Sequence, residues 1–174
     1  MAEQNNQILL ETKDLQKHFP IKDFFGRKKQ AVKAVDGITF QIRKGETFGL
    51  VGESGCGKST LGRTLIRMYE PTGGQIIFDG EDITKIEGAK LQPYHKRMQI
   101  IFQDPYSALD PHHNVEEIIR EPMSLYTNAS KSDIDEQIVE LLKKVGMKAD
   151  DMYKYAYEFS GGQRQRIGIA RALA

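Results

Sequence analysis

The chain has 174 residues, one cysteine and a formal net charge of +1, because 25 basic residues nearly cancel 24 acidic ones. That length is typical of one ordinary domain, and a single cysteine excludes an intrachain disulfide and a cysteine-rich metal site. The near-zero net charge argues against a protein that binds nucleic-acid phosphates. The polar N-terminus and the short apolar runs resemble neither a signal peptide nor a membrane-spanning helix. The composition therefore predicts a soluble, cytoplasmic globular protein.

Strand patterns dominate the chain up to about Gln103. Short strands are expected at Gln7–Leu10 and over Ala31–Ile42, where apolar residues partly alternate with polar ones. A fully buried strand is expected at Thr47–Val51, because this mostly apolar run leads into a glycine-rich stretch. The other expected strands are Gln75–Phe78 and Met98–Phe102.

Helical patterns dominate the rest of the chain, after one earlier helix that is expected at Lys58–Tyr69. Asn114 is expected to cap a helix over Val115–Arg120, which Pro122 then interrupts. The last two expected helices are one that opens with a capping box of Ser132 and Asp135 and ends at Gly146, and one that begins at Ser160.

The stretch from Gly52 to Ser59 (GESGCGKS) fits the pattern G-x-x-x-x-G-K-[ST] between an expected strand and an expected helix. Glycines let backbone N–H groups converge on phosphate oxygens, and the helix N-terminus adds a partial positive charge. Lys58 is expected to reach the β- and γ-phosphates, and the Ser59 hydroxyl to bind Mg²⁺. Cys56 is interpreted as a small side chain that leaves space, with a reactive thiol as the alternative. The predicted phosphate-binding residues are Gly52, Glu53, Ser54, Gly55, Cys56, Gly57, Lys58, Ser59 and Thr60.

A second glycine motif (SGGQ) opens the last expected helix. Ser160 is a natural N-cap, and the glycines leave backbone N–H groups free, so the motif is an anion site of the same physical type. From these residues alone, a simple helix start is the alternative. The predicted binding residues of this second motif are Ser160, Gly161, Gly162 and Gln163.

Together the two motifs resemble the nucleotide-binding domain of an ATP-binding-cassette (ABC) transporter, over nearly the whole chain. The SGGQ motif is similar to the family's signature loop, and Gln103 resembles its Q-loop glutamine. Phe19 stands where the family has an aromatic residue that stacks on adenine. The resemblance implies an α/β P-loop NTPase fold with an N-terminal antiparallel β-subdomain and a helical subdomain. It places the β-subdomain and ATP-binding core at about 7–104, and the helical subdomain at about 105–174.

The resemblance also implies the chemistry and the partners. Water attacks the γ-phosphate of ATP, with Lys58 and Gln103 as catalytic residues and Ser59 and Gln103 as Mg²⁺ ligands. Two such domains, identical or different, face each other head to tail, and each ATP lies between the phosphate loop of one and the signature loop of the other. Transmembrane permease subunits and an extracytoplasmic solute-binding protein complete the implied complex, and the chain is peripheral at the cytoplasmic face of the membrane.

A narrower resemblance concerns the transported substrate. The stretch from Ile101 to Pro111 (IFQDPYSALDP) and the stretch FSGGQRQR are similar to ATPase subunits of oligopeptide and dipeptide importers. Those relatives usually have Y-P-H-E before the signature, whereas Tyr155–Glu158 reads YAYE. Nickel and glutathione importers share much of the pattern and are one alternative. A soluble ABC ATPase of DNA repair or translation is the other, although such proteins usually carry long insertions or tandem cassettes.

The chain stops at Ala174, inside the last expected helix. The family's next elements are a strand that carries paired acidic residues and, later, a switch histidine. That strand belongs beside Thr47–Val51 in the family's parallel sheet. We therefore expect an incomplete core sheet with an open apolar edge, and a chain that binds nucleotide without hydrolysing it.

Overall fold

The computed structural model describes residues 7–22, 28–127 and 129–174. The chain divides into two compact units, one that ends at Met98 and one over Gln99–Ala174. Each unit has its own cluster of buried apolar side chains. In the part of the chain that the structure describes, no helix is long and apolar enough to span a membrane.

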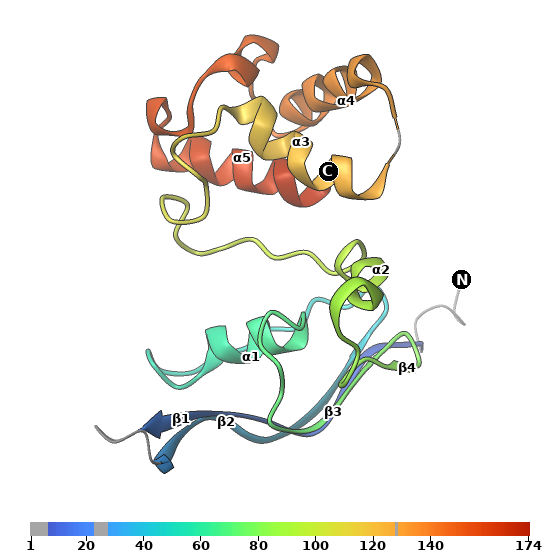
Figure 1. Ribbon diagram of the computed structural model, residues 1–174, viewed down its shortest axis with the longest axis vertical. Helices are drawn as coiled ribbons and strands as arrows, with labels where there is room; N and C mark the ends of the chain where they lie inside the picture. The colour runs from blue at the N-terminus through green and yellow to red at the C-terminus, as the bar shows by residue number, and fades with distance from the viewer. Residues whose placement is uncertain (1–6, 23–27, 128) are drawn as a thin grey trace. The chain divides into compact units, whose positions relative to one another are not determined.

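The first unit is built on a four-stranded antiparallel sheet with the strand order β2-β1-β3-β4. β1 and β2 pair along their whole length, whereas β3 pairs with β1 only over Leu10–Gln16, so the outer half of the β1–β2 ribbon is two-stranded (Figure 1). This sheet is the predicted antiparallel β-subdomain. Its strands are β1 (Ile8–Lys22), β2 (Lys28–Arg43), β3 (Gly73–Phe78) and β4 (Glu81–Asp82).

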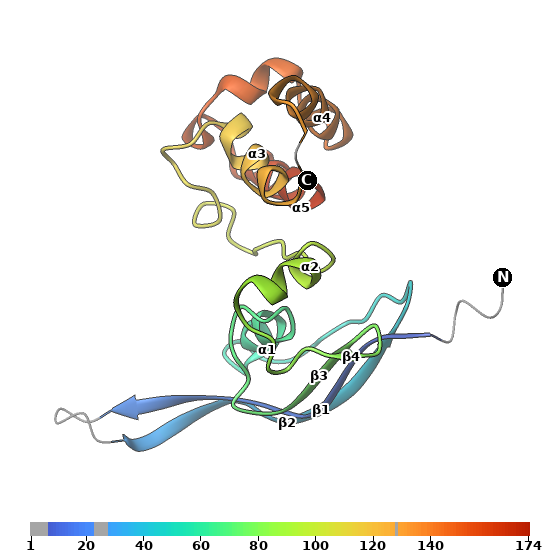
Figure 2. The same ribbon diagram turned by 45° about the vertical axis from the view of Figure 1, so that its right-hand side comes forward.

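The helix α1 (Lys58–Leu65) lies over one face of this sheet, as Figures 1 and 2 both show. Leu61 of α1 is buried together with Leu15 and Ile76 from the sheet, because alternate strand residues point to the face that the helix covers. A short η2 (Gly88–Leu91) and α2 (Gln92–His95) complete this unit.

The predicted helix over Lys58–Tyr69 ends four residues early. Arg67 has a left-handed backbone with a φ of 61°, which no α-helix can include. Its buried guanidinium donates from Nε to the carbonyl oxygen of Ile83, at 3.1 Å. The tertiary hydrogen bond thus accompanies a turn that the apolar periodicity did not reveal.

The two strands predicted at Thr47–Val51 and Met98–Phe102 are not formed. Both segments have irregular backbone. Val51 is 95% exposed, and Leu50 and Ile101 are about half exposed. A strand is stabilised by hydrogen bonds to its neighbours, and in the described part of the chain neither segment has a partner strand. Apolar composition alone therefore mispredicted these two segments.

The second unit is a helical bundle in which α3, α4 and α5 pack on one another (Figure 2). The helices bury apolar residues at a spacing of three and four, as amphipathic helices do around a shared core. Its elements are α3 (Val115–Tyr126), α4 (Lys131–Lys144), η3 (Ala149–Tyr153), η4 (Ala156–Glu158) and α5 (Gly161–Leu173). Its fully buried side chains include Val115, Ile119, Ile138, Leu142 and Ile167.

The predicted cap at the start of α3 is confirmed and its predicted end is wrong. Asn114 accepts a hydrogen bond from the Glu117 N–H at 2.8 Å, and the Glu117 carboxylate accepts one in return from the Asn114 N–H. The helix does not stop at Arg120 but continues through Pro122. Met123, one residue beyond the proline, is buried in the core, so packing continues the helix where the proline alone would end it.

The helix α4 begins two residues earlier than predicted. Its capping box consists of Ser130 and Asp133, which have the same spacing as the predicted Ser132 and Asp135. Asp135 instead pairs with the guanidinium of Arg120 on α3. The predicted spacing was therefore right, but the residues assigned to it were wrong, and Asp135 belongs to the contact between α3 and α4.

Candidate nucleotide-binding site

The glycine loop approaches the sheet closely at its last glycine. Gly57 directly precedes α1 and has a φ of 98°. A Cβ placed on Gly57 would lie 2.1 Å from the carbonyl oxygen of Ala34 in β2, which is far inside van der Waals contact. Glycine is therefore required here both by the backbone conformation and by the close approach of β2. The end of the loop and the start of α1 therefore lie directly against β2.

Lys58 is the first residue of α1, and its side chain folds back over the loop. The Lys58 Nζ donates to the carbonyl oxygens of Gly52, at 2.7 Å, and of Glu53, and it lies 3.6 Å from the Cys56 Sγ. Ser59 follows in the first helical turn with an exposed side chain. The ammonium group is thus held at the loop by carbonyl oxygens, which phosphate oxygens would have to replace as its acceptors.

Phe19 lies on the β1–β2 ribbon. Its partner across the ribbon is Val32, two residues from the Ala34 that contacts the loop. The half-buried Phe19 ring packs edge to face on Tyr69, with the ring centroids 5.6 Å apart. The Lys17 Nζ lies over the same ring, 5.0 Å from its centroid. Phe19 and the phosphate loop therefore belong to the same unit.

Ser160 caps α5, as predicted. The Ser160 N–H donates to the Gln163 Oε1 at 3.0 Å, and the Gln163 N–H donates to the Ser160 Oγ at 3.4 Å. The side chain of Gln163 is therefore engaged in the capping box. A Cβ on Gly162 would meet nothing within 4 Å, so a ligand has room to approach the backbone there.

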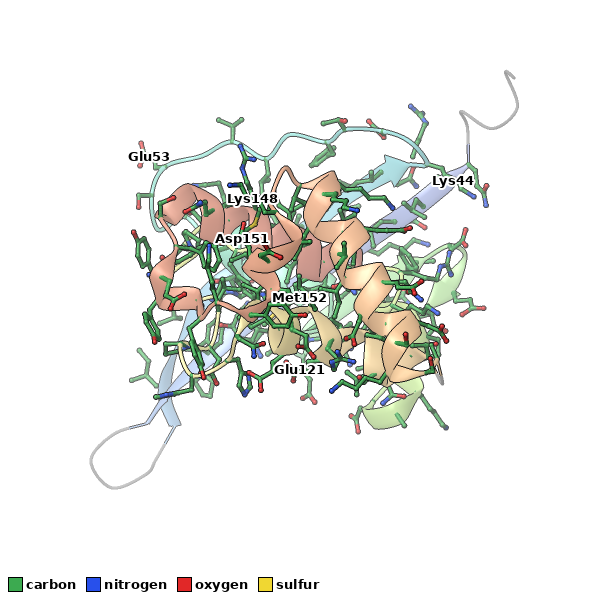
Figure 3. The ribbon with its side chains drawn as sticks, turned by 90° about the horizontal axis from the view of Figure 1, so that it is seen from above. Lys44, Glu53, Glu121, Lys148, Asp151 and Met152 are labelled. Carbon is green, nitrogen blue, oxygen red and sulfur yellow. The ribbon has the colours of Figure 1, made fainter. Side chains whose placement is uncertain are left out.

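A shallow cavity of about 420 Å³ adjoins the signature residues. Arg166 lies beside it and donates to the carbonyl oxygens of Val145 and Gly146 at the end of α4. Figure 3 labels Lys148 and Asp151, whose backbone N–H and carboxylate form a hydrogen bond of 3.1 Å. The cavity is lined by Gly146, Met147, Lys148, Asp151, Ser160, Gly162, Gln163 and Arg166.

Gln103 has an exposed side chain in an irregular segment of the second unit. The next residue, Asp104, organises a turn. Hydrogen bonds from the Ser107 hydroxyl and from the Tyr106 N–H hold the pKa of the Asp104 carboxyl below its ordinary value. The predicted residues are thus divided between units: Phe19 and the phosphate loop lie in the first, whereas Gln103 and the signature residues lie in the second.

Arg164 supports the signature loop, and the sequence did not reveal this role. Its Nε donates to the carbonyl oxygen of Phe159 at 2.9 Å, and one of its terminal nitrogens donates to that of Tyr157 at 3.0 Å. These two bonds fix the backbone that enters the loop. A basic residue in the first turns of a helix is a weak signal, because its backbone acceptors are not visible in a sequence.

The described residues contain no group of three or more His, Cys, Asp or Glu side chains that could hold a metal ion. The glycine-rich turn and the lysine at the start of α1 are features of a phosphate-binding loop. The fold and this loop define the chain as a phosphate-loop nucleotide-binding domain.

The family model described as ABC transporter matches residues 35–174. The chain is 49% identical, over 99% of its length, to the oligopeptide transport ATP-binding protein AppF of Bacillus subtilis (strain 168), of which it covers 53%. It is 43% identical, over 96% of its length, to the dipeptide transport ATP-binding protein DppF of Escherichia coli (strain K12), of which it covers 50%. The chain spans about half the length of these curated relatives.

A solved structure agrees with the fold. The dimeric structure of MJ0796, a bacterial ABC transporter cassette, superposes with a TM-score of 0.80 at 26% identity, and covers 95% of this chain and 69% of that one. The chain therefore belongs to the ABC transporter family. The resemblance to the oligopeptide and dipeptide type and the expected ABC-type fold are both confirmed.

Proposed function

We propose that this chain forms the ATP-binding part of an ABC importer, which couples ATP binding and hydrolysis to the uptake of oligopeptides or dipeptides. The observation that carries the proposal is the phosphate loop, in which Gly57 fits only as glycine and Lys58 opens the helix. The names of AppF and DppF support a peptide as the transported solute.

In this proposal the phosphate loop holds the triphosphate of ATP. The Lys58 ammonium exchanges its carbonyl acceptors for β- and γ-phosphate oxygens, and the N–H groups of the first helical turn bind the remaining charge. Phe19 stacks on the adenine ring. The Ser59 hydroxyl and the Gln103 amide oxygen hold Mg²⁺, which when bound neutralises charge on the phosphate oxygens.

The proposal gives the catalytic roles to Lys58 and Gln103. Lys58 stabilises the negative charge that develops on the γ-phosphate oxygens, while Gln103 orients the attacking water. The N-terminal stretch of about 7–104 supplies the β-subdomain and the ATP-binding core, and the stretch of about 105–174 supplies the helical subdomain.

The proposed partners are a second ABC ATPase domain, membrane-embedded permease subunits and an extracytoplasmic solute-binding protein. MJ0796, which shares this fold, is described as a dimeric cassette, and this supports a paired arrangement. In that arrangement Ser160, Gly161, Gly162 and Gln163 of one domain face the ATP held by the other. The chain then acts at the cytoplasmic face of the membrane.

Lys58→Ala tests the proposal directly. Loss of two charge-assisted hydrogen bonds to phosphate is expected to weaken ATP binding at least about tenfold, measured by titration calorimetry. Lys44→Ala removes an exposed lysine outside the loop and is expected to leave the ATP affinity unchanged. Equal affinities for ATP in the wild type and Lys58→Ala would refute the proposed role of the loop.

Ser160→Arg tests the second anion site. A bulky cation at this N-cap is expected to block ATP-dependent dimerisation, measured by size-exclusion chromatography, while ATP affinity is retained. Ser132→Arg, at an exposed position of α4, is the matched control and is expected to dimerise like the wild type. Normal dimerisation of the Ser160→Arg variant would count against the proposed role of the signature residues.

A further inference from the structure

The ring of Tyr106 lies close to two residues of α5. The Arg164 guanidinium carbon is 4.3 Å from the Tyr106 ring centroid, a cation–π distance. On the same ring, the hydroxyl oxygen and two ring carbons come within 3.3 to 3.7 Å of the position that a Cβ on Gly161 would take. Tyr106 therefore contacts the signature loop although it belongs to the segment that carries Gln103.

Arg164 links this ring to the backbone before the loop. The edge of its guanidinium donates to the carbonyl oxygens of Phe159 and Tyr157, at 2.9 and 3.0 Å. The guanidinium lies over the Tyr106 ring, so the ring limits the rotations that would break these two hydrogen bonds. Because Phe159 immediately precedes Ser160, a displacement of Arg164 would shift the backbone at the N-cap of α5.

The position of Tyr106 is itself fixed by its neighbours. Its N–H donates to the Asp104 carboxylate at 2.9 Å, which sets the turn that presents the ring. Two residues later, the carbonyl oxygen of Ala108 accepts a hydrogen bond of 2.7 Å from Arg171 of α5. Leu109 is buried in the helical core. The segment is thus anchored to the helical core by the residues that follow Tyr106 in the chain, whereas Gln103 precedes Tyr106.

We propose that Tyr106 is a positioning residue, which holds the signature loop through Arg164 and ties it to the segment that carries Gln103. The function of this tie rests on the proposed function, in which the signature loop binds ATP held by a second domain. A shift of the Gln103 segment would then alter the geometry of the signature loop without any contact between Tyr106 and nucleotide.

The tie is tested by the NMR signal of the Arg164 Nε–H in the whole chain. In the wild type, this proton is expected to exchange slowly with water, because it is hydrogen-bonded to the carbonyl oxygen of Phe159. It is also expected to show a ring-current shift, because the Arg164 guanidinium lies over the Tyr106 ring. Tyr106→Ala is expected to remove the shift and to speed exchange about three- to tenfold. Tyr106→Phe keeps the ring and should preserve both signatures, as should the control Tyr153→Ala at another exposed tyrosine.

A second variant separates the loss of the contact between Tyr106 and Arg164 from a general loosening of the fold. Arg164→Lys keeps the charge but loses the planar guanidinium and its fork of donors. Adding Tyr106→Ala to Arg164→Lys is expected to change ATP-dependent self-association little, whereas Tyr106→Ala alone should weaken it about three- to tenfold. Tyr106→Phe, which keeps the ring, should self-associate like the wild type.

The outcomes distinguish the two proposals. If the wild type does not self-associate with ATP, the proposed function fails, and the Arg164 Nε–H signal still decides whether Tyr106 holds the loop. An Nε–H signal in Tyr106→Ala that matches the wild type in shift and exchange would overturn the tie. Equal self-association of the wild type and Tyr106→Ala would overturn its functional role.

Discussion

At Gly57 one absent methyl group decides whether the phosphate loop can form. The sequence motif predicted the loop, and the structure adds the reason for this glycine: the carbonyl oxygen of Ala34 occupies the place of a Cβ. No motif spacing points to Ala34, which lies more than twenty residues earlier in β2. Arg164 was missed for the same reason, because its acceptors are backbone carbonyls. Motif spacing points to the candidate residues, whereas it says nothing of the backbone groups that surround them.

Gly57→Ala is expected to destabilise the first unit more than Gly55→Ala. Both glycines have positive φ, so either alanine costs about 1–2 kcal/mol of backbone strain. A Cβ on Gly55 meets nothing within 4 Å, whereas one on Gly57 collides with a backbone oxygen, so only Gly57→Ala should cost more than this strain. Urea unfolding followed by circular dichroism measures the difference. Equal free energies of unfolding for the two variants would contradict the clash.

Among the elements, those that carry their own hydrogen bonds were predicted best. α4 and α5 are both formed, each with a capping box and buried apolar residues, because a helix satisfies its backbone internally. The strands expected at Thr47–Val51 and Met98–Phe102 failed, because a strand depends on a neighbour that its own residues do not specify. α3 shows the opposite error, since core packing carried a helix through a proline that the sequence reads as a stop.

Pro122→Ala is expected to stabilise the second unit. Pro122 has no N–H to donate to the carbonyl oxygen of Ile118 one turn earlier, and an interior helical proline costs about 3 kcal/mol relative to alanine. Lost contacts of the half-buried ring offset part of this gain, so a net increase of about 1 kcal/mol or more is expected in the urea unfolding free energy. Glu121→Ala, at an exposed neighbouring position, is the near-neutral control. A less stable Pro122→Ala variant would mean that the ring packing outweighs the missing hydrogen bond.

Among the residues that the structure describes, the buried side chains form two separate clusters. One joins the sheet to α1, and the other joins α3, α4 and α5. The sequence changes from strand patterns to helix patterns near Gln103, and the structure divides the chain after Met98. The predicted domain limit at about residue 104 stays a prediction. The buried residues of the second core were easier to predict, because α3, α4 and α5 bury apolar residues at helical spacing. The first core was harder to predict, because it depends on the pairing of distant strands.

Two matched core substitutions test whether the clusters are independent units of stability. Ile76 of β3 and Ile138 of α4 are both fully buried, one in each cluster. Truncation of either to alanine is expected to cost about 2–5 kcal/mol. Because neither cluster includes residues of the other unit, calorimetry should resolve two transitions, with Ile76→Ala lowering only one midpoint and Ile138→Ala only the other. A single transition shifted equally by both variants would show instead that the two units unfold as one cooperative body.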